Sequence, residues 1–266
     1  MRLCTFRDDG RTRLGSVQGE SVRPLDGDDV RDAIGNGAPA PSGPLLALEG
    51  LELLAPLAPG KLLGIGLNYR DHAAETGAEL PREPLVFAKL TSSLTGPGAR
   101  IVRPDYTDEL DYEGELAVVI GRRARAVPAE RALEHVFGYA VMNDVTARDR
   151  QRAEPQWIRA KGGDTFAPFG PWVTTADEVA DPQALTIRTT VNGEVRQDGR
   201  TADMVFSVAE LVAWCSASFT LDPGDVISTG TPAGVGVART PQAFLAPGDR
   251  VRVEIAGLGA LDNTVR

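Results

Sequence analysis

The chain of 266 residues predicts an α+β fold that is mostly β. Short runs of strand-forming residues outnumber the helical segments, and the two kinds of element do not alternate regularly. Regular alternation is the pattern of doubly wound sheets and α/β barrels, so neither is favoured here. Asn192-Gly193, between two strand-like runs, predicts a hairpin because both residues tolerate a positive φ. A mixed, mostly β architecture fits these observations.

Residues 1–25 are expected to form short strands around turns such as Asp9-Gly10, followed by a short helix over 28–34. We place a domain boundary near residue 60, which separates a small N-terminal α+β domain (1–60) from a larger domain (61–266). The strands expected in the larger domain are Lys61–Ile65, Leu85–Ala88, Leu116–Ile120, Ala184–Val191, Asp225–Ser228 and Arg250–Ile255.

Helices are expected over 129–136, roughly 147–159, and 208–217. The last of these follows Ser207-Val-Ala-Glu210, which is the pattern of a capping box. In such a box the serine and glutamate side chains bond backbone N–H groups that the first helical turn leaves without partners.

Composition and charge exclude several classes of protein. The net charge is −9 and there is no basic stripe, so nucleic acid is not an expected partner. No apolar run approaches the ~18 residues that span a bilayer, and the N-terminus lacks the apolar core of a signal peptide. Cys4 and Cys215 are far apart, which fits a reducing compartment and a cytoplasmic location.

Acidic residues at the start of a buried strand predict a metal site. If residues 110–121 form one strand, Asp111, Glu113 and Glu115 point to the same side. Neighbouring carboxylates raise one another's pKa unless a cation compensates, and oxygen ligands suit Mg²⁺, Mn²⁺ or Ca²⁺. Asp144 ends another apolar stretch and could join them. The alternatives are a solvated strand start and, for Asp144, a helix N-cap.

A histidine and a glutamate lie three residues apart in an expected short helix that ends near Gly77. His72 and Glu75 would share a face there and could hydrogen-bond. An imidazole oriented by a carboxylate is a usual general base for activating water. The alternative is an ordinary surface pair. His135 has no such partner, and we assign it to structure.

Two further segments can contact an anion. Gly230-Thr231-Pro-Ala-Gly-Val-Gly236 follows a strand, and a glycine-rich loop in that position offers backbone N–H groups. It lacks the lysine of a P-loop. Lys161 lies in an expected loop, where it could polarise a carbonyl, bind a carboxylate or be an ordinary surface lysine.

These segments occur in the order seen in the fumarylacetoacetate hydrolase family, and the resemblance covers about residues 60–266. The similar blocks are Gly66–Glu75, Pro84–Lys89, Ser93–Gly98, Asp111–Gly121, Asn143–Asp149, Lys161–Pro171 and Thr229–Gly236. The resemblance implies a mixed β-roll catalytic domain with a small N-terminal domain, usually as a homodimer.

It also implies roles for individual residues. Glu113, Glu115 and Asp144 would bind Mg²⁺ or Mn²⁺, whereas Asp111 has no ligand role in the family pattern. His72 and Glu75 would activate a water molecule. The residues expected to contact the substrate are Lys161, Arg148, Gln151, Gly230 and Thr231.

The activity implied is metal-dependent hydrolysis of a C–C bond in a small anionic acylpyruvate-type acid, through a metal-bound enolate. Two other reactions use the same chemistry: decarboxylation of oxaloacetate-type acids and isomerisation of hydroxymuconate-type diacids. The His72–Glu75 pair favours hydrolysis, because isomerisation needs no attacking water. A non-catalytic, metabolite-binding member of the family is the alternative of another class.

Overall fold

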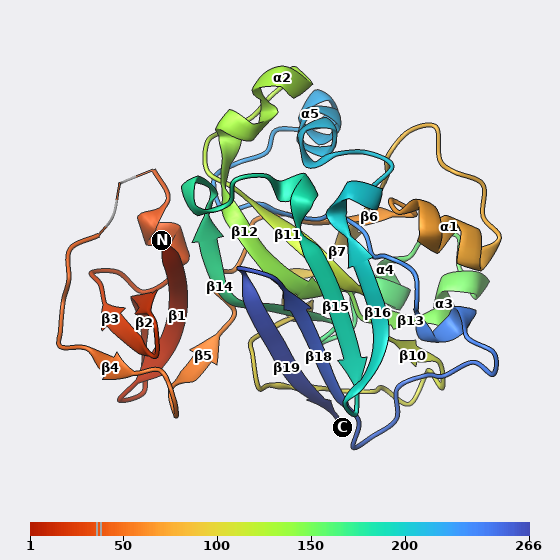
Figure 1. The fold of residues 1–266 in the computed structure, drawn as a ribbon, viewed down its shortest axis with the longest axis horizontal. Coiled ribbons are helices and arrows are strands. Elements are labelled where there is room, and N and C mark those ends of the chain that lie inside the picture. Colours follow the sequence, from red (N-terminus) through yellow and green to blue (C-terminus); the bar gives the residue numbers. More distant parts are fainter. Residues whose placement is uncertain (36, 38) are drawn as a thin grey trace.

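The computed structural model describes residues 1–35, 37 and 39–266, and strands dominate it, as expected (Figure 1). Among the described residues, the strands form a twelve-stranded sheet, a five-stranded sheet and a two-stranded pair. The path through the large sheet is β4-β3-β2-β1-β14-β12-β11-β17-β6-β7, with β5 beside β1 and β8 beside β14. Within the same ranges, no helix is both long enough and apolar enough to cross a bilayer.

The strands are short. Their bounds are β1 Arg2–Asp8, β2 Arg11–Gln18, β3 Ser21–Pro24, β4 Leu46–Ala47, β5 Glu52–Leu54, β6 Leu62–Gly66, β7 Leu85–Lys89, β8 Leu94–Thr95, β9 Arg100–Ile101, β10 Leu110–Asp111, β11 Gly114–Ile120, β12 Val136–Asn143, β13 Thr146–Ala147, β14 Ala167–Thr175, β15 Thr186–Val191, β16 Glu194–Arg200, β17 Val226–Ser228, β18 Arg250–Ile255 and β19 Gly259–Val265. The α-helices are α1 Arg70–Thr76, α2 Ala129–Ala132, α3 Arg148–Ala153, α4 Ile158–Lys161 and α5 Val208–Ser218.

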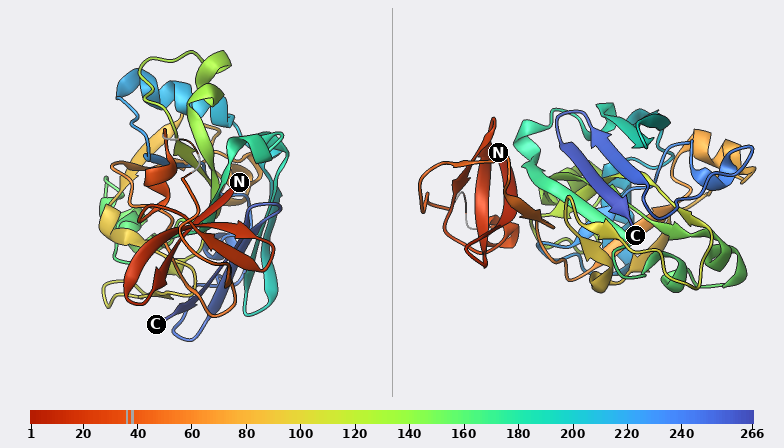
Figure 2. Two further views of the ribbon diagram at one scale, coloured as in Figure 1. Left: turned by 90° about the vertical axis from the view of Figure 1, so that its left-hand side faces the viewer. Right: turned by 90° about the horizontal axis from the view of Figure 1, so that it is seen from below.

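The N-terminal strands β1 to β5 project from one end of the molecule (Figure 2). Strand β1 pairs antiparallel with β14, with Leu3 opposite Val173, and so extends the large sheet. Leu3, Leu14 and Val30 share a buried cluster with residues of β11, β12 and β14. The division near residue 60 stays a prediction, because the first strands share both a sheet and a core with the rest of the chain.

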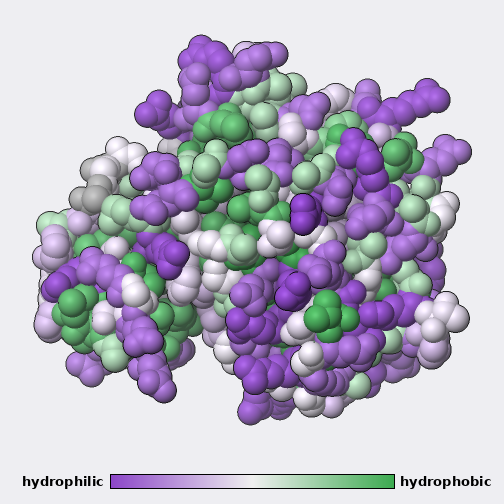
Figure 3. Space-filling view, viewed as in Figure 1, coloured by the Kyte–Doolittle hydropathy of each residue, from purple (hydrophilic) through white to green (hydrophobic). Residues whose placement is uncertain are grey.

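The five-stranded sheet, β16-β15-β18-β19-β9, packs over β11, β12 and β14. Its strands β15 and β18 alternate buried and exposed side chains, as expected for a sheet with one solvated face. Hydrophilic residues predominate over this outer face in Figure 3, with a small hydrophobic patch among them. The apolar side chains between the two sheets form the main core.

The predicted hairpin and capping box are confirmed. Strands β15 and β16 are antiparallel neighbours, and Asn192 and Gly193 join them with φ of 52° and 82°. In α5 the Ser207 hydroxyl accepts the Glu210 N–H, while the Glu210 carboxylate accepts the Ser207 N–H.

Replacing Ser207 with alanine removes one of these caps, so the free energy of unfolding should fall by about 1 kcal/mol. Urea denaturation of Ser207→Ala and Ser207→Asp measures it. The aspartate variant, which keeps a capping oxygen, should recover most of the loss. Equal losses in both variants would show that the cap is not responsible.

Two expected helices are interrupted. The segment 147–159 forms α3 and α4, separated by an extended Glu154, because the following Pro155 disfavours the helical conformation of the residue before it. The segment 129–136 forms the short helix α2 and a 3₁₀ turn, Leu133–His135, and Val136 already begins β12.

The expected continuous strand over 110–121 is also wrong in its first part. Strand β10 ends at Asp111 and pairs with β13, whereas β11 begins at Gly114 and pairs with β12 and β17. Tyr112 and Glu113 form an irregular connection between them. The simple alternation of side chains therefore does not extend from Asp111 to Glu113.

Candidate metal centre and adjoining pocket

Three buried carboxylates meet where β11 begins and β12 and β17 end. Glu113 and Glu115 flank Gly114, which pairs with Asn143 at the end of β12, so Asp144 follows directly beside Glu113. The Asp144 N–H donates to the Glu113 carbonyl at 2.8 Å. One carboxylate oxygen from each of the three acids lies within 4.8 Å of the others. The antiparallel register thus brings together acids about thirty positions apart.

The two glutamates have opposite electrostatic environments. Burial and the charges of Asp144 and Glu113 raise the pKa of Glu115 from 4.5 to about 8. Burial would also raise the pKa of Glu113, but Lys161 and Arg148 outweigh it and lower that pKa to about 2. Glu115 lacks a comparable cation: its hydrogen-bond donors among the described residues are the Ser228 hydroxyl and the Gly230 N–H.

Two buried lysines hold the other two acids. Lys161 donates to Glu113 at 2.6 Å and to Asp144 at 2.8 Å. It is the last residue of α4 and is buried, so neither the expected loop nor the surface alternative holds. Lys89, at the end of β7, donates to Asp144 and to the Lys161 carbonyl. Burial lowers the pKa of Lys89, whereas the surrounding carboxylates raise that of Lys161 despite its burial.

The sequence patterns described above predict no role for Lys89. The signal for Lys89 is its place at the end of the apolar run of β7, and a lysine that becomes buried is rarely left without a partner.

The three acids fit a divalent cation. Ionising Glu115 beside Glu113 and Asp144 is unfavourable, as its raised pKa shows, and a bound cation would reverse that effect. All three offer oxygen ligands, the type that Mg²⁺, Mn²⁺ and Ca²⁺ prefer. The chain therefore contains a buried acidic triad able to hold a divalent metal ion.

The predicted histidine–glutamate pair is present in α1. The Nδ1 atom of His72 lies 2.7 Å from Oε1 of Glu75, and the imidazole is buried. The other Glu75 oxygen accepts the Gly234 N–H at 2.8 Å, which fastens α1 to the glycine-rich loop. Gly234 has a φ of +110°, and a Cβ there would lie 2.0 Å from the Arg196 carbonyl oxygen. Only glycine can bring this amide to Glu75.

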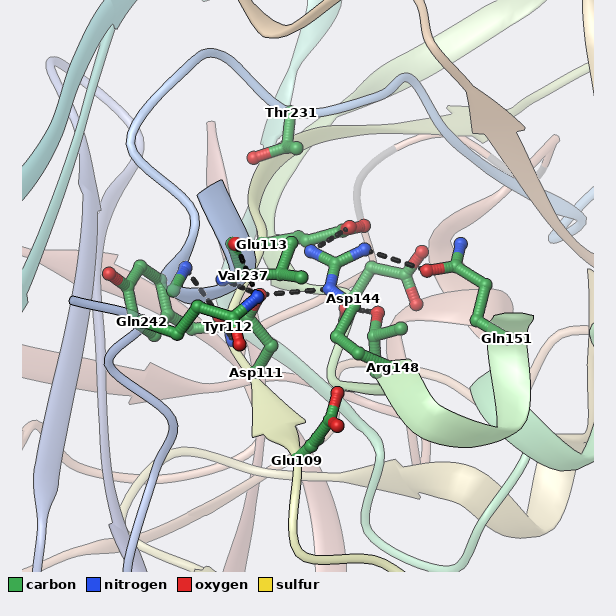
Figure 4. Close-up of polar contacts among 12 residues, drawn as sticks. Glu109, Asp111, Tyr112, Glu113, Asp144, Arg148, Gln151, Thr231, Val237 and Gln242 are labelled. Atoms are coloured by element: carbon green, nitrogen blue, oxygen red, sulfur yellow. Dashed lines mark hydrogen bonds and ion pairs between the residues drawn. The ribbon is translucent and has the colours of Figure 1, made fainter. Parts of the chain in front are cut away.

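Arg148 connects the acidic triad to its surroundings (Figure 4). Its guanidinium pairs with Glu113 at 2.7 Å and with Asp111 at 2.8 Å, and donates to the Gln151 side-chain oxygen at 2.9 Å. Asp111 also accepts the N–H groups of Gly236 and Val237. Asp111 therefore faces Arg148 and the glycine-rich loop, and it stands outside the acidic triad.

The two predicted residues of the glycine-rich loop have different environments. The Gly230 N–H is bonded to Glu115, at 2.9 Å. Thr231 donates to the Gly114 carbonyl and accepts from Gln197, and its side chain reaches the pocket described next.

A cavity of about 340 Å³ joins these groups. Glu75, Asp144 and Gly230 do not line the cavity themselves. Each is hydrogen-bonded to a residue that does: Glu75 to His72, Asp144 to Lys161 and Gly230 to Glu115. The predicted site residues that line the cavity are His72, Glu113, Glu115, Arg148, Gln151, Lys161 and Thr231.

The chain belongs to the fumarylacetoacetate hydrolase family, which the resemblance predicted. Residues 61–266 match the family domain described as fumarylacetoacetate (FAA) hydrolase, C-terminal. Residues 1–56 match an N-terminal domain described as Rv2993c-like. Family members include proteins named as tautomerases and isomerases, and this chain is a member of that enzyme family.

One similar protein is oxaloacetate tautomerase fahd2 of Xenopus laevis, 46% identical over 224 residues that cover 83% of this chain and 70% of the relative. A solved fumarylacetoacetate hydrolase from Exiguobacterium antarcticum is 40% identical with a TM-score of 0.92, covering 100% of this chain and 99% of that one. A 5-carboxymethyl-2-hydroxymuconate delta-isomerase from Mycobacterium smegmatis is 39% identical with a TM-score of 0.87 and the same coverage.

Proposed function

We propose that the protein is a divalent-metal-dependent enzyme that moves a proton at the carbon next to the 2-oxo group of a small oxo acid. The observation that supports this most is the shared cavity: His72, held by Glu75, lines the same pocket as Glu113 and Glu115. A cation held by Glu113, Glu115 and Asp144 would supply Lewis-acid stabilisation of negative charge on the substrate's oxygens.

The residues of the chain itself suit keto–enol tautomerisation. Glu75 accepts the Nδ1–H of His72, so Nε2 is left as the basic nitrogen. His72 can take the proton from an enol oxygen and return a proton to the neighbouring carbon, which balances the conversion of enol to keto acid. The name of the Xenopus laevis relative, an oxaloacetate tautomerase, supports this choice among the reactions of the family.

Hydrolysis of an acylpyruvate is the second candidate. The same oriented pair can take a proton from water, and the hydroxide would attack the distal carbonyl. The bond from that carbonyl carbon to C3 would then break, and return of the proton from His72 to C3 would give pyruvate and a carboxylic acid. This reaction needs room for a water molecule beside His72, and the cavity at this position offers it.

NMR with two substrates separates the candidates. Oxaloacetate dissolved as its enol and diluted into Mg²⁺-loaded protein should convert to the keto form faster than in Mg²⁺ buffer alone. Pyruvate formed from oxaloacetate above the metal-only rate would instead indicate decarboxylation. Pyruvate and acetate formed from acetylpyruvate would indicate hydrolysis. Turnover of neither acid would contradict an enzymatic role on 2-oxo acids.

Replacing His72 with alanine should lower turnover by about 10²- to 10⁴-fold, because the proton-transfer group is lost. Mn²⁺ binding, followed by electron paramagnetic resonance, should be unchanged, since His72 is not in the acidic triad. His135→Ala is the matched control, as His135 lies outside the pocket. Full activity of His72→Ala would refute its role.

A further inference from the structure

One face of α3 supplies three side chains to the wall of the cavity. Arg148, Gln151 and Arg152 are three and four residues apart, the spacing that places side chains on one side of a helix. Asp149 and Arg150 do not line the cavity: Asp149 accepts from Thr107, and Arg150 pairs with Asp149.

The cationic side chains that line the described part of the pocket differ in their partners. Arg148 and Lys161 are both buried. Arg148 pairs with Asp111, and Lys161 pairs with Glu113 and Asp144, so the charges of both cations are balanced by buried carboxylates. Arg152 pairs instead with Glu109 outside the triad, and its side chain is 54% exposed.

The contact between Arg152 and Glu109 leaves donors available. A single guanidinium nitrogen, Nη2, contacts both Glu109 oxygens, at 2.7 and 2.5 Å. A guanidinium has five N–H donors on three nitrogens, and the contact with Glu109 uses only those of Nη2. Nη1 of Arg152, which has no hydrogen-bond partner among the described residues, can therefore donate to an oxygen of a second carboxylate without breaking the pair.

From this arrangement we propose that Arg152 is the specificity-determining residue for a second carboxylate of the substrate, so that the site prefers dicarboxylic 2-oxo acids. Glu109 competes for the same guanidinium and weakens that preference. The inference rests on the proposed function, because it assumes that the 2-oxo acid end of the ligand lies at the acidic triad. Trp157, also in the wall, offers an apolar surface to the carbon chain between the two ends.

Two acids of equal chain length test this. 2-Oxoglutarate and 2-oxopentanoate differ in the carboxylate at the far end, and their binding to Mg²⁺-loaded protein is measured by isothermal titration calorimetry, with Mg²⁺ alone as blank. The wild type should bind 2-oxoglutarate more tightly. Arg152→Gln should reduce that preference about tenfold, because a charge-assisted hydrogen bond is lost. Glu109→Gln should increase it. Arg150→Gln, on the same helix, is the matched control and should leave it unchanged.

Opposite shifts in Arg152→Gln and Glu109→Gln, with unchanged affinity for 2-oxopentanoate, are the expected result, and a general loss of structure cannot produce them. If the variants bind both acids with the wild-type ratio, Arg152 is not the specificity residue, although the proposed function stands. If the wild type binds neither acid, the proposed function itself is overturned, and this inference with it.

Discussion

Replacing Glu115 with glutamine should abolish metal-dependent turnover and weaken Mn²⁺ binding by more than about 100-fold. The neutral amide keeps the shape of the side chain but removes a charged ligand from the acidic triad. Mutation of a residue that only hydrogen-bonds a metal ligand already lowers metal affinity or activity by about 10- to 100-fold. Calorimetry with Mn²⁺ and the NMR assay measure the two losses. EDTA treatment of the wild type should reproduce the loss of turnover.

The same variant has a second expected effect, on stability. Folding raises the pKa of Glu115 from 4.5 to about 8, so the metal-free folded protein binds this proton more tightly than the unfolded chain. This contribution to the free energy of unfolding is complete below about pH 4.5 and is lost as the pH rises to about 8. Glutamine does not titrate. Metal-free Glu115→Gln should therefore be more stable than the wild type at pH 8.

Thermal unfolding of both proteins in EDTA, between pH 5 and pH 8, measures this difference. Adding Mg²⁺ should stabilise the wild type far more than the variant, because the ion binds the folded state. A wild type whose stability does not change over this range, or a variant that remains active, would contradict the assignment of Glu115 to the metal site.

Replacing Asp111 with asparagine should lower the free energy of unfolding by about 3–5 kcal/mol, the usual effect of removing one partner of a buried ion pair. The Asp111 carboxylate is fully buried and accepts from Arg148 and from three backbone N–H groups, those of Tyr112, Gly236 and Val237. An amide has one accepting oxygen where the carboxylate has two, so donors are left without partners.

Urea denaturation measures this loss. Asp108→Asn is the matched control, because the Asp108 side chain is 96% exposed in its pair with Arg103. Its effect should stay within about 0.5 kcal/mol. Equal effects of the two substitutions would show that the Asp111–Arg148 pair is not essential to the fold.

Much of the fold could be predicted because the patterns that specify it are local. The hairpin at Asn192-Gly193 depends on two residues that accept positive φ, and the Ser207–Glu210 box depends on two side chains three positions apart. The predicted helix and strand bounds are wrong where one residue or a change of pairing partner interrupts the sequence pattern. Pro155 divides the helix expected over 147–159, and the chain leaves one sheet after Asp111 to enter another at Gly114.

For the candidate site, the order of the residues is enough to identify which groups are available: the His72–Glu75 pair, which shares one helical turn, and the acids that begin or follow buried strands. How these groups combine into a site depends on the packing of segments that are distant in the chain. The register of β11 with β12 places Asp144 beside Glu113, and the packing of β7 and α4 buries Lys89 and Lys161 against them. Pairing and packing between distant segments set these charges and distances, because a carboxylate's pKa and its partners depend on neighbours in space.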